Sequence, residues 1–314
     1  MKNILITIFV IIVLAVNTNA NAFGVININV KVIDESGKQL KDAKLRVRFS
    51  GGEMPVIRNT DDKGNCSITS SSNDGVVVGT AIKDGYYDST FHHDFYAQKL
   101  GVWQPWGKKL TVVMRPIVNP VPMYVRNASF NVPVTEEEVG FDLEKADWVI
   151  PYGQGTHSDF IFNVERRFDN VDNFDAKMTL TFSNAHDGIQ VFKDDGGGDF
   201  NVGSWFRLSR MAPESGYQSN LERRRSRGSY GRYDDKNEAE DNNFIFRVRS
   251  EVDETGNLKR AMYGKIRGDI RFSTGVLKVG MHYYLNSDYT SNLEFDPKRN
   301  LFVITDPGEN VTAP

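Results

Sequence analysis

The sequence has 314 residues, of which 39% are hydrophobic, 11% aromatic and 25% charged, and its formal net charge at pH 7 is −3. This composition is typical of globular proteins, and the length allows two domains. The nearly neutral charge argues against a general polyanion-binding surface, and therefore against nucleic acid as a partner. Cys66 is the only cysteine, which excludes an internal disulfide.

The beginning of the sequence has the pattern of an export signal. An apolar run extends from Ile4 to Val16, and Ala20-Asn21-Ala22 has the small-residue spacing of a cleavage site. The run is too short to be retained as a membrane-spanning helix. We therefore expect residues 1–22 to be a removed signal peptide, with no membrane insertion afterwards. The mature protein would be exported, either periplasmic or secreted.

Residues 23–115 show the alternation of apolar and polar residues that predicts β-strands. Ile26, Ile28 and Val30 alternate with asparagines, which is typical of a strand with one buried face. Further short segments of the same kind follow, separated by turns rich in Asp and Gly. No segment here has helical periodicity, so we predict a β-domain.

Several segments of this domain carry a family resemblance. They are Val30-Lys31-Val32-Ile33-Asp34 with Gly37, Leu40 and Ala43, then Thr60-Asp61-Asp62-Lys63-Gly64, then Ala81-Ile82-Lys83-Asp84-Gly85-Tyr86. Residues 25–115 resemble a carboxypeptidase-regulatory-like module. The resemblance implies a transthyretin-like or Ig-like β-sandwich of about seven strands. It also implies a non-catalytic accessory or spacer role in secreted proteins, without peptidase activity.

An aromatic segment, residues 86–109, departs from the compact pattern of that family. It contains Tyr87, Tyr96, Trp103 and Trp106. Flat aromatic faces beside polar groups can stack on sugar rings or on apolar peptide side chains, and the two tryptophans would form that platform. The alternative is that these rings cover the end of the sandwich or pack against a second domain. The sequence leaves both interpretations open.

A proline-rich stretch divides the chain. Residues 116–122 contain three prolines and are expected to form an extended, semi-rigid linker. Residues 123–305 contain many short alternating segments separated by Gly, Asn and Asp, which predict a larger antiparallel, jelly-roll-like β-sandwich. The whole chain is therefore expected to be all-β.

Two segments of this half are expected to lack regular structure. Residues 214–241 have almost no aliphatic side chains, and their charge changes from basic at Arg223-Arg224-Arg225 to acidic near Asp241. Such a segment buries little apolar surface, so we predict a mobile charged loop. We also predict a flexible tail over residues 306–314.

Acidic clusters raise the question of calcium. Asp194, Asp195 and Asp199 surround three glycines, so hard oxygen ligands stand beside a backbone that can turn its carbonyls inward. A weaker candidate is the series Asp169, Asp172 and Asp175. Neither matches an EF-hand loop, and solvated turns are the alternative for both. Calcium is the only cofactor that the sequence offers, and binding no cofactor is the alternative.

Catalytic patterns are weak throughout the sequence. His92-His93-Asp94 and His157-Ser158-Asp159 contain suitable residue types, but neighbours on a strand point to opposite faces and do not converge on one ion or substrate. Carboxylates on or near the expected strands include Glu165, Glu251, Glu294 and Asp296. On a half-exposed sheet, such residues usually belong to the solvated face. No catalytic pair is nominated.

These patterns favour an exported, non-catalytic β-sandwich protein that binds a surface, which would be a polysaccharide or a surface protein. One alternative makes the second domain a glycan-active hydrolase or lyase with an N-terminal accessory domain. Another makes both domains structural spacers of an envelope assembly. Fold analogy alone does not separate these three hypotheses.

Overall fold

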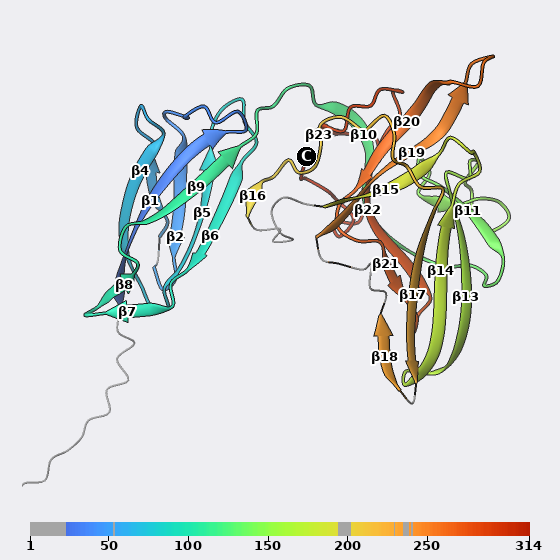
Figure 1. Ribbon diagram of the computed structural model, residues 1–314, viewed down its shortest axis with the longest axis horizontal. Helices are drawn as coiled ribbons and strands as arrows, with labels where there is room; N and C mark the ends of the chain where they lie inside the picture. Colours follow the sequence, from blue (N-terminus) through green and yellow to red (C-terminus); the bar gives the residue numbers. More distant parts are fainter. Residues whose placement is uncertain (1–22, 53, 194–201, 229, 235–238, 240) are drawn as a thin grey trace, which may run out of the picture.

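The computed structural model describes residues 23–314 except 53, 194–201, 229, 235–238 and 240. The described residues fold into two β-sandwiches (Figure 1). The all-β prediction is therefore confirmed. Within these residues, no helix has the length and apolar character needed to cross a membrane. The expected signal peptide, residues 1–22, lies outside the described part of the chain.

The first sandwich packs two sheets face to face. Strands of one sheet follow the order β4-β1-β8-β7, with β9 also paired to β1; they are β1 (Gly24–Asp34), β4 (Asn65–Ser72), β7 (Ala97–Lys99), β8 (Val102–Gln104) and β9 (Lys108–Met114). The other sheet has the order β16-β6-β5-β2-β3; its strands are β2 (Lys44–Phe49), β3 (Val56–Asn59), β5 (Val76–Ile82), β6 (Ser89–Asp94) and β16 (Gly203–Ser204).

The core of this sandwich follows from the period-two pattern. Ile26, Ile28 and Val30 are buried, while the residues between them are partly or fully exposed. They pack against Leu45 and Val47 of the opposite sheet. Because side chains alternate between the two faces of a strand, each apolar residue of β1 enters the space between the sheets.

The second sandwich is also built from two sheets. One has the order β15-β19-β20-β22-β10-β23, with β21 paired to β22; its strands are β10 (Val121–Asn131), β15 (Gly188–Lys193), β19 (Asn242–Val252), β20 (Leu258–Ile266), β21 (Arg271–Ser273), β22 (Lys278–Asn286) and β23 (Phe295–Asn300). The other has the order β12-β11-β13-β14-β17-β18; its strands are β11 (Glu138–Asp142), β12 (Asp147–Trp148), β13 (Phe160–Asn170), β14 (Asn173–Thr181), β17 (Asn220–Gly228) and β18 (Gly231–Asp234).

The chain passes several times between the two sheets of the second sandwich. β10, β15 and β19 lie in one sheet, whereas β11 to β14 and then β17 and β18, which come between them in sequence, lie in the other. Some neighbours within a sheet are also consecutive in sequence, as in β13-β14 and β19-β20. Aromatic rings such as Phe160, Phe162 and Phe246 fill the core between the two sheets.

The prediction of a mobile loop over residues 214–241 is wrong for much of the segment. β17 pairs with β14 from Asn220 to Arg227, and β18 continues the sheet. Arg223 turns inward to Asp269, at 2.8 Å, and Arg224 turns outward to Asp175, also at 2.8 Å. The lack of aliphatic side chains suggested disorder. Main-chain hydrogen bonds and ion pairs stabilise this strand instead.

The prediction of a flexible tail is also wrong. Val311 is buried among Met123, Tyr284 and Phe295. Glu309 forms an ion pair with Arg126. One buried valine and one partly buried ion pair thus hold this mostly polar tail against the sheet of β10 and β22.

Candidate functional site at the junction of the two sandwiches

The second half of the chain contributes a strand to the first sandwich. β16 pairs with the start of β6, with Gly203 opposite Thr90 and Ser204 opposite Ser89. Next to it, the Trp205 N–H donates to the carbonyl of Asp88 at 2.8 Å. Because these are main-chain hydrogen bonds, the junction continues a sheet of one domain with residues that belong to the other (Figure 1).

Glu294 lies at the centre of the junction and is buried. Its carboxylate accepts hydrogen bonds from the Tyr87 hydroxyl at 2.7 Å and from the N–H groups of Val118 and Asn119, each at 2.9 Å. Burial, followed by the hydrogen bond and charge of Glu294, raises the pKa of Tyr87. The carboxylate thus joins the first domain, the linker and the second domain.

Asn292 adds a second connection to the linker. Its side-chain amide donates to the carbonyl of Asn119 at 2.7 Å, and its side-chain oxygen accepts from the N–H of Glu294 at 2.9 Å. The expected semi-rigid linker is therefore held from the second domain along part of its length.

Phe206 occupies the space between the domains and is fully buried. Its ring stacks on that of Tyr87, with 5.1 Å between centroids. The guanidinium carbons of Arg115 and Arg210 lie 4.4 and 5.1 Å from the Phe206 centroid, and the Lys265 ammonium lies 4.8 Å from it. Three cations thus face one ring, an arrangement that the negative ring face favours.

Glu35 of the first domain binds two of these cations. Its carboxylate lies 3.0 Å from Arg115 and 3.2 Å from Arg210. Arg115 also donates to the carbonyls of Phe206 and Leu208, at 3.3 and 2.6 Å. The charges at the junction are therefore satisfied by one another and by backbone carbonyls of the opposite domain.

Lys265 is different, because among the described residues its ammonium has no hydrogen-bond acceptor. It is buried and lies over two aromatic rings, those of Phe206 and Tyr284, at 4.8 and 4.6 Å. Burial lowers the pKa of Lys265 to about 7, and the neighbouring charges of Arg267 and Arg115 act in the same direction. The pKa of this buried amine therefore lies near neutral pH.

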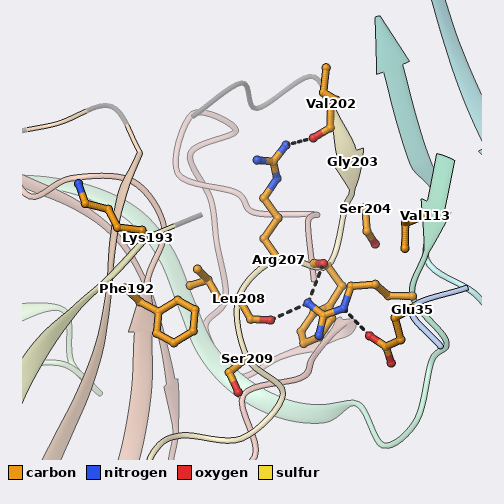
Figure 2. A pocket seen from close by; sticks show the side chains of 12 residues that line it. Glu35, Val113, Phe192, Lys193, Val202, Gly203, Ser204, Arg207, Leu208 and Ser209 are labelled. Carbon is orange, nitrogen blue, oxygen red and sulfur yellow. Dashed lines mark hydrogen bonds and ion pairs between the residues drawn. The ribbon is translucent and has the colours of Figure 1, made fainter. Parts of the chain in front are cut away.

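A cleft of about 550 Å³ opens beside the junction. Figure 2 shows its residues, with the Glu35 ion pair on one side and Lys193 on the other. Lys193 binds Asp241 and Asn242 at 2.8 and 2.6 Å. The lysine of the cleft, like the ion pair opposite it, is thus already engaged within the protein. We interpret the site as a rigid joint between domains.

The four aromatic residues singled out in the sequence are not brought together. Tyr87 is buried in the junction, so it is not available to a sugar platform. Trp103 is half-buried and donates to the carbonyl of Ser72 at 3.2 Å. Tyr96 and Trp106 are exposed at the other end of the first sandwich. Packing therefore accounts for Tyr87 and Trp103, and only the other two rings are open to a ligand.

The first calcium candidate, Asp194, Asp195 and Asp199, lies outside the described residues. In the second, each carboxylate has a partner of its own: Asp169 binds Asn173 at 2.7 Å, Asp172 binds Arg227 at 3.1 Å and Asp175 binds Arg224 at 2.8 Å. Within the described part of the chain, no three His, Cys, Asp or Glu side chains gather as metal ligands.

The side chains within each histidine motif do not meet at one site. His92 binds Asp94 at 2.9 Å, whereas the ring of His93 packs edge-on against Phe95. His157 is exposed, but Asp159 is buried and binds Arg249 at 2.7 Å. These side chains therefore perform local structural roles.

Sequence reasoning missed the residues of the junction. Glu294 was interpreted as part of a solvated sheet face, which is wrong because it is buried at the end of the segment before β23. Its acceptor role depends on Tyr87, which is 207 positions away in the sequence. Arg115 and Arg210 likewise carry no local pattern. Phe206 lies outside the strands of the described residues, so strand alternation does not mark it either.

The sequence matches no protein-family model and no curated protein. Among solved structures, it is similar to a 3-chlorocatechol 1,2-dioxygenase from Rhodococcus opacus, with 10% identity, a TM-score of 0.26, and coverage of 32% of this chain and 62% of that one. A DUF3823 family protein from Parabacteroides merdae has 8% identity and a TM-score of 0.20, over 87% and 99% of the two chains. The major pilin subunit of Bacillus cereus has 8% identity and a TM-score of 0.21, over 83% and 67%. Values this low assign neither a family nor a function.

Proposed function

We propose that this protein is an exported, non-catalytic surface protein whose two β-sandwiches act as one rigid body. The observation that carries the proposal is the junction, where β16 extends the sheet of β6 and the buried Glu294 joins both domains and the linker. Domains that only share a tether keep their relative motion. A junction built from main-chain pairing and buried charge instead fixes the distance and angle between two surfaces, which is what a spacer or a binding arm requires.

Buried carboxylates support the non-catalytic part of the proposal. Asp159 binds Arg249, and Asp187 accepts from the N–H of Ser250 at 3.0 Å. Glu294 is occupied by the junction. A catalytic acid or base needs a free proton-transfer position next to the substrate, and these groups are engaged in holding the fold together.

The first domain fits the accessory role implied by its resemblance to carboxypeptidase-regulatory-like modules. Its main strands form two facing sheets, with β1 next to both β4 and β9. In this proposal the first domain is a spacer that carries the larger sandwich. Polysaccharide as its ligand would depend on Tyr96 and Trp106, the two exposed rings of the aromatic segment.

Antibody labelling of cells tests the location of the protein. We expect the full chain to be processed near Phe23 and labelled outside the cytoplasm.

Small-angle scattering tests the rigidity of the junction. We expect Glu294→Ala to broaden the distribution of interdomain distances, while Glu251→Ala, which removes an exposed ion pair with Arg260, leaves it unchanged.

Two results would contradict the proposal. One is a protein that remains in the cytoplasm with residues 1–22 attached. The other is polysaccharide turnover in a broad substrate screen that is lost when a buried carboxylate is replaced by its amide.

A further inference from the structure

Exposed apolar side chains gather at the end of the first sandwich that lies away from the linker. Figure 1 shows β7 and β8 at this end. Leu100 and Tyr96 are 95% and 90% exposed, which is close to the exposure of an unfolded chain. We call the surface the apolar tip; its members are Phe23, Val25, Met54, Tyr96, Leu100 and Trp106.

The apolar tip is one surface because hydrogen bonds join its loops. They run from the N–H of Val25 to the carbonyl of Gly101 at 2.8 Å, from the N–H of Phe95 to the carbonyl of Gly75 at 3.0 Å, and from the hydroxyl of Ser50 to Asp74 at 2.8 Å. Loops of both sheets therefore end side by side, and their exposed side chains share one end of the domain.

Trp103 shows how an aromatic ring packs at this end. Its ring lies against the backbone of Gly24 and Gly75, where a β-carbon would approach within 3.0 Å of the indole. The glycines make room for this ring, whereas Tyr96 and Trp106 of the same segment face solvent. Exposed apolar side chains that gather at one end of a domain mark a candidate interaction surface.

We propose that the apolar tip rests on the surface of a lipid bilayer. Tyr and Trp are the side chains that favour the membrane–water boundary, because each joins an apolar ring to a polar group. Lys99 is exposed beside Leu100, and Lys108 follows Trp106 by two positions. Such lysines place their charge among anionic head groups while their stems cover apolar surface.

Charge selects lipid as the occupant. Residues 95–109 contain Tyr96, Leu100 and Trp106 of the apolar tip, and their only charged side chains are Lys99, Lys108 and Lys109. Apolar side chains combined with positive charge match the surface of an anionic bilayer. This inference does not depend on the rigid junction.

Vesicle co-sedimentation tests the inference, using the chain from Phe23 onward because Ile4–Val16 would itself bind lipid. The vesicles contain phosphatidylethanolamine with phosphatidylglycerol, or phosphatidylcholine alone. We expect binding to both, stronger to the anionic vesicles and reduced by salt. Replacing three side chains of the apolar tip should weaken binding at least about tenfold; the changes are Tyr96→Ser, Leu100→Ser and Trp106→Ser.

A matched control changes three exposed apolar side chains of the second sandwich; its changes are Ile150→Ser, Val171→Ser and Val303→Ser. It should bind as the unchanged chain does, and both variants should keep the melting temperature. The proposal is overturned if the unchanged chain stays in the supernatant with both vesicle types, or if the control loses as much binding as the tip variant. Binding to an insoluble glycan through the apolar tip, without vesicle binding, would assign this surface to carbohydrate instead.

Discussion

Glu294 is closed off from water, yet its carboxylate accepts three hydrogen bonds from the first domain and the linker. A carboxylate can be buried only where donors replace its hydration. At the scale of single residues, burying this carboxylate without donors would be very unfavourable. Because its donors come from the first domain and the linker, it connects the two domains instead. Lys265 is its opposite, since its amine is buried against two rings with no acceptor among the described residues.

Removing the Glu294 carboxylate should destabilise the protein strongly. Glu294→Ala leaves the Tyr87 hydroxyl and the N–H groups of Val118 and Asn119 without their acceptor, and we expect the free energy of unfolding to fall by about 4 kcal/mol. Urea denaturation measures the loss. Glu251→Ala, which breaks an exposed pair, should change it by less than about 1 kcal/mol. Equal effects of the two substitutions would contradict the central role of Glu294.

Lys265 should make stability depend on pH in the neutral to alkaline range. Folding lowers its pKa from 10.5 to about 7, so between those values the unfolded chain binds more protons than the folded one. The free energy of unfolding should then rise with pH, by about 2 kcal/mol between pH 7 and pH 9 relative to Lys265→Met. Thermal melting of both proteins across this range measures the difference. Parallel pH profiles would show that Lys265 does not titrate there.

At the scale of elements, β17 shows how a strand forms without aliphatic side chains. Arg223 points inward over the ring of Phe244, at 5.7 Å, and binds Asp269, while Arg224 points outward to Asp175. The long stem of an arginine can occupy a partly buried position when its guanidinium finds a partner. The side chains of β17 still alternate between the two faces of the sheet. The inward Arg223 and the outward Arg224 are both charged, and each binds its own acidic partner.

Trypsin distinguishes such a strand from a mobile loop. The peptide bonds after Arg223, Arg224 and Arg225 should resist cleavage under native conditions, because a protease needs an extended segment that has left its sheet. Mass spectrometry of the fragments locates the cuts, and the same bonds should be cut rapidly in urea. Rapid native cleavage at these three arginines would show that β17 is not stably paired.

The comparison of β1 with β17 shows what the sequence can predict. Ile26, Ile28 and Val30 alternate with polar residues, so strand, face and core position follow from local pattern alone. Arg223 and Arg225 offer no such pattern, because their burial depends on Asp269 and on the carbonyl of Phe272, which lie elsewhere in the chain. The tail is a similar case, since Val311 is buried only because β10 and β22 pass beneath it.

The junction could not be predicted for the same reason. The fold class follows from local alternation of apolar and polar residues, and the all-β class is confirmed. The contacts of Glu294 and Phe206 arise only when two completed sandwiches meet. Exposed aromatic residues such as Tyr96 and Trp106 were identifiable as a distinctive segment, but which of its rings pack and which face solvent depends on the loops around them.

At the scale of the whole molecule, the two cores are separate and the junction couples them. One core lies between the sheets of the first sandwich and another between those of the second. Two domains with independent cores unfold separately unless their interface is strong enough to link them. The sheet shared through β16 and the ion pairs of Glu35 provide that link.

This coupling gives a prediction for calorimetry. The unchanged protein should unfold in a single transition, because opening the junction exposes Phe206 and strips Glu294 of its donors. Glu294→Ala combined with Arg210→Ala should separate the transition into two, since each sandwich then melts at the temperature that its own core sets. The matched control, Glu251→Ala with Arg260→Ala, removes a charge pair of the same kind from an exposed position and should keep one transition. Two resolved transitions in the unchanged protein would mean that the sandwiches are joined only by the chain.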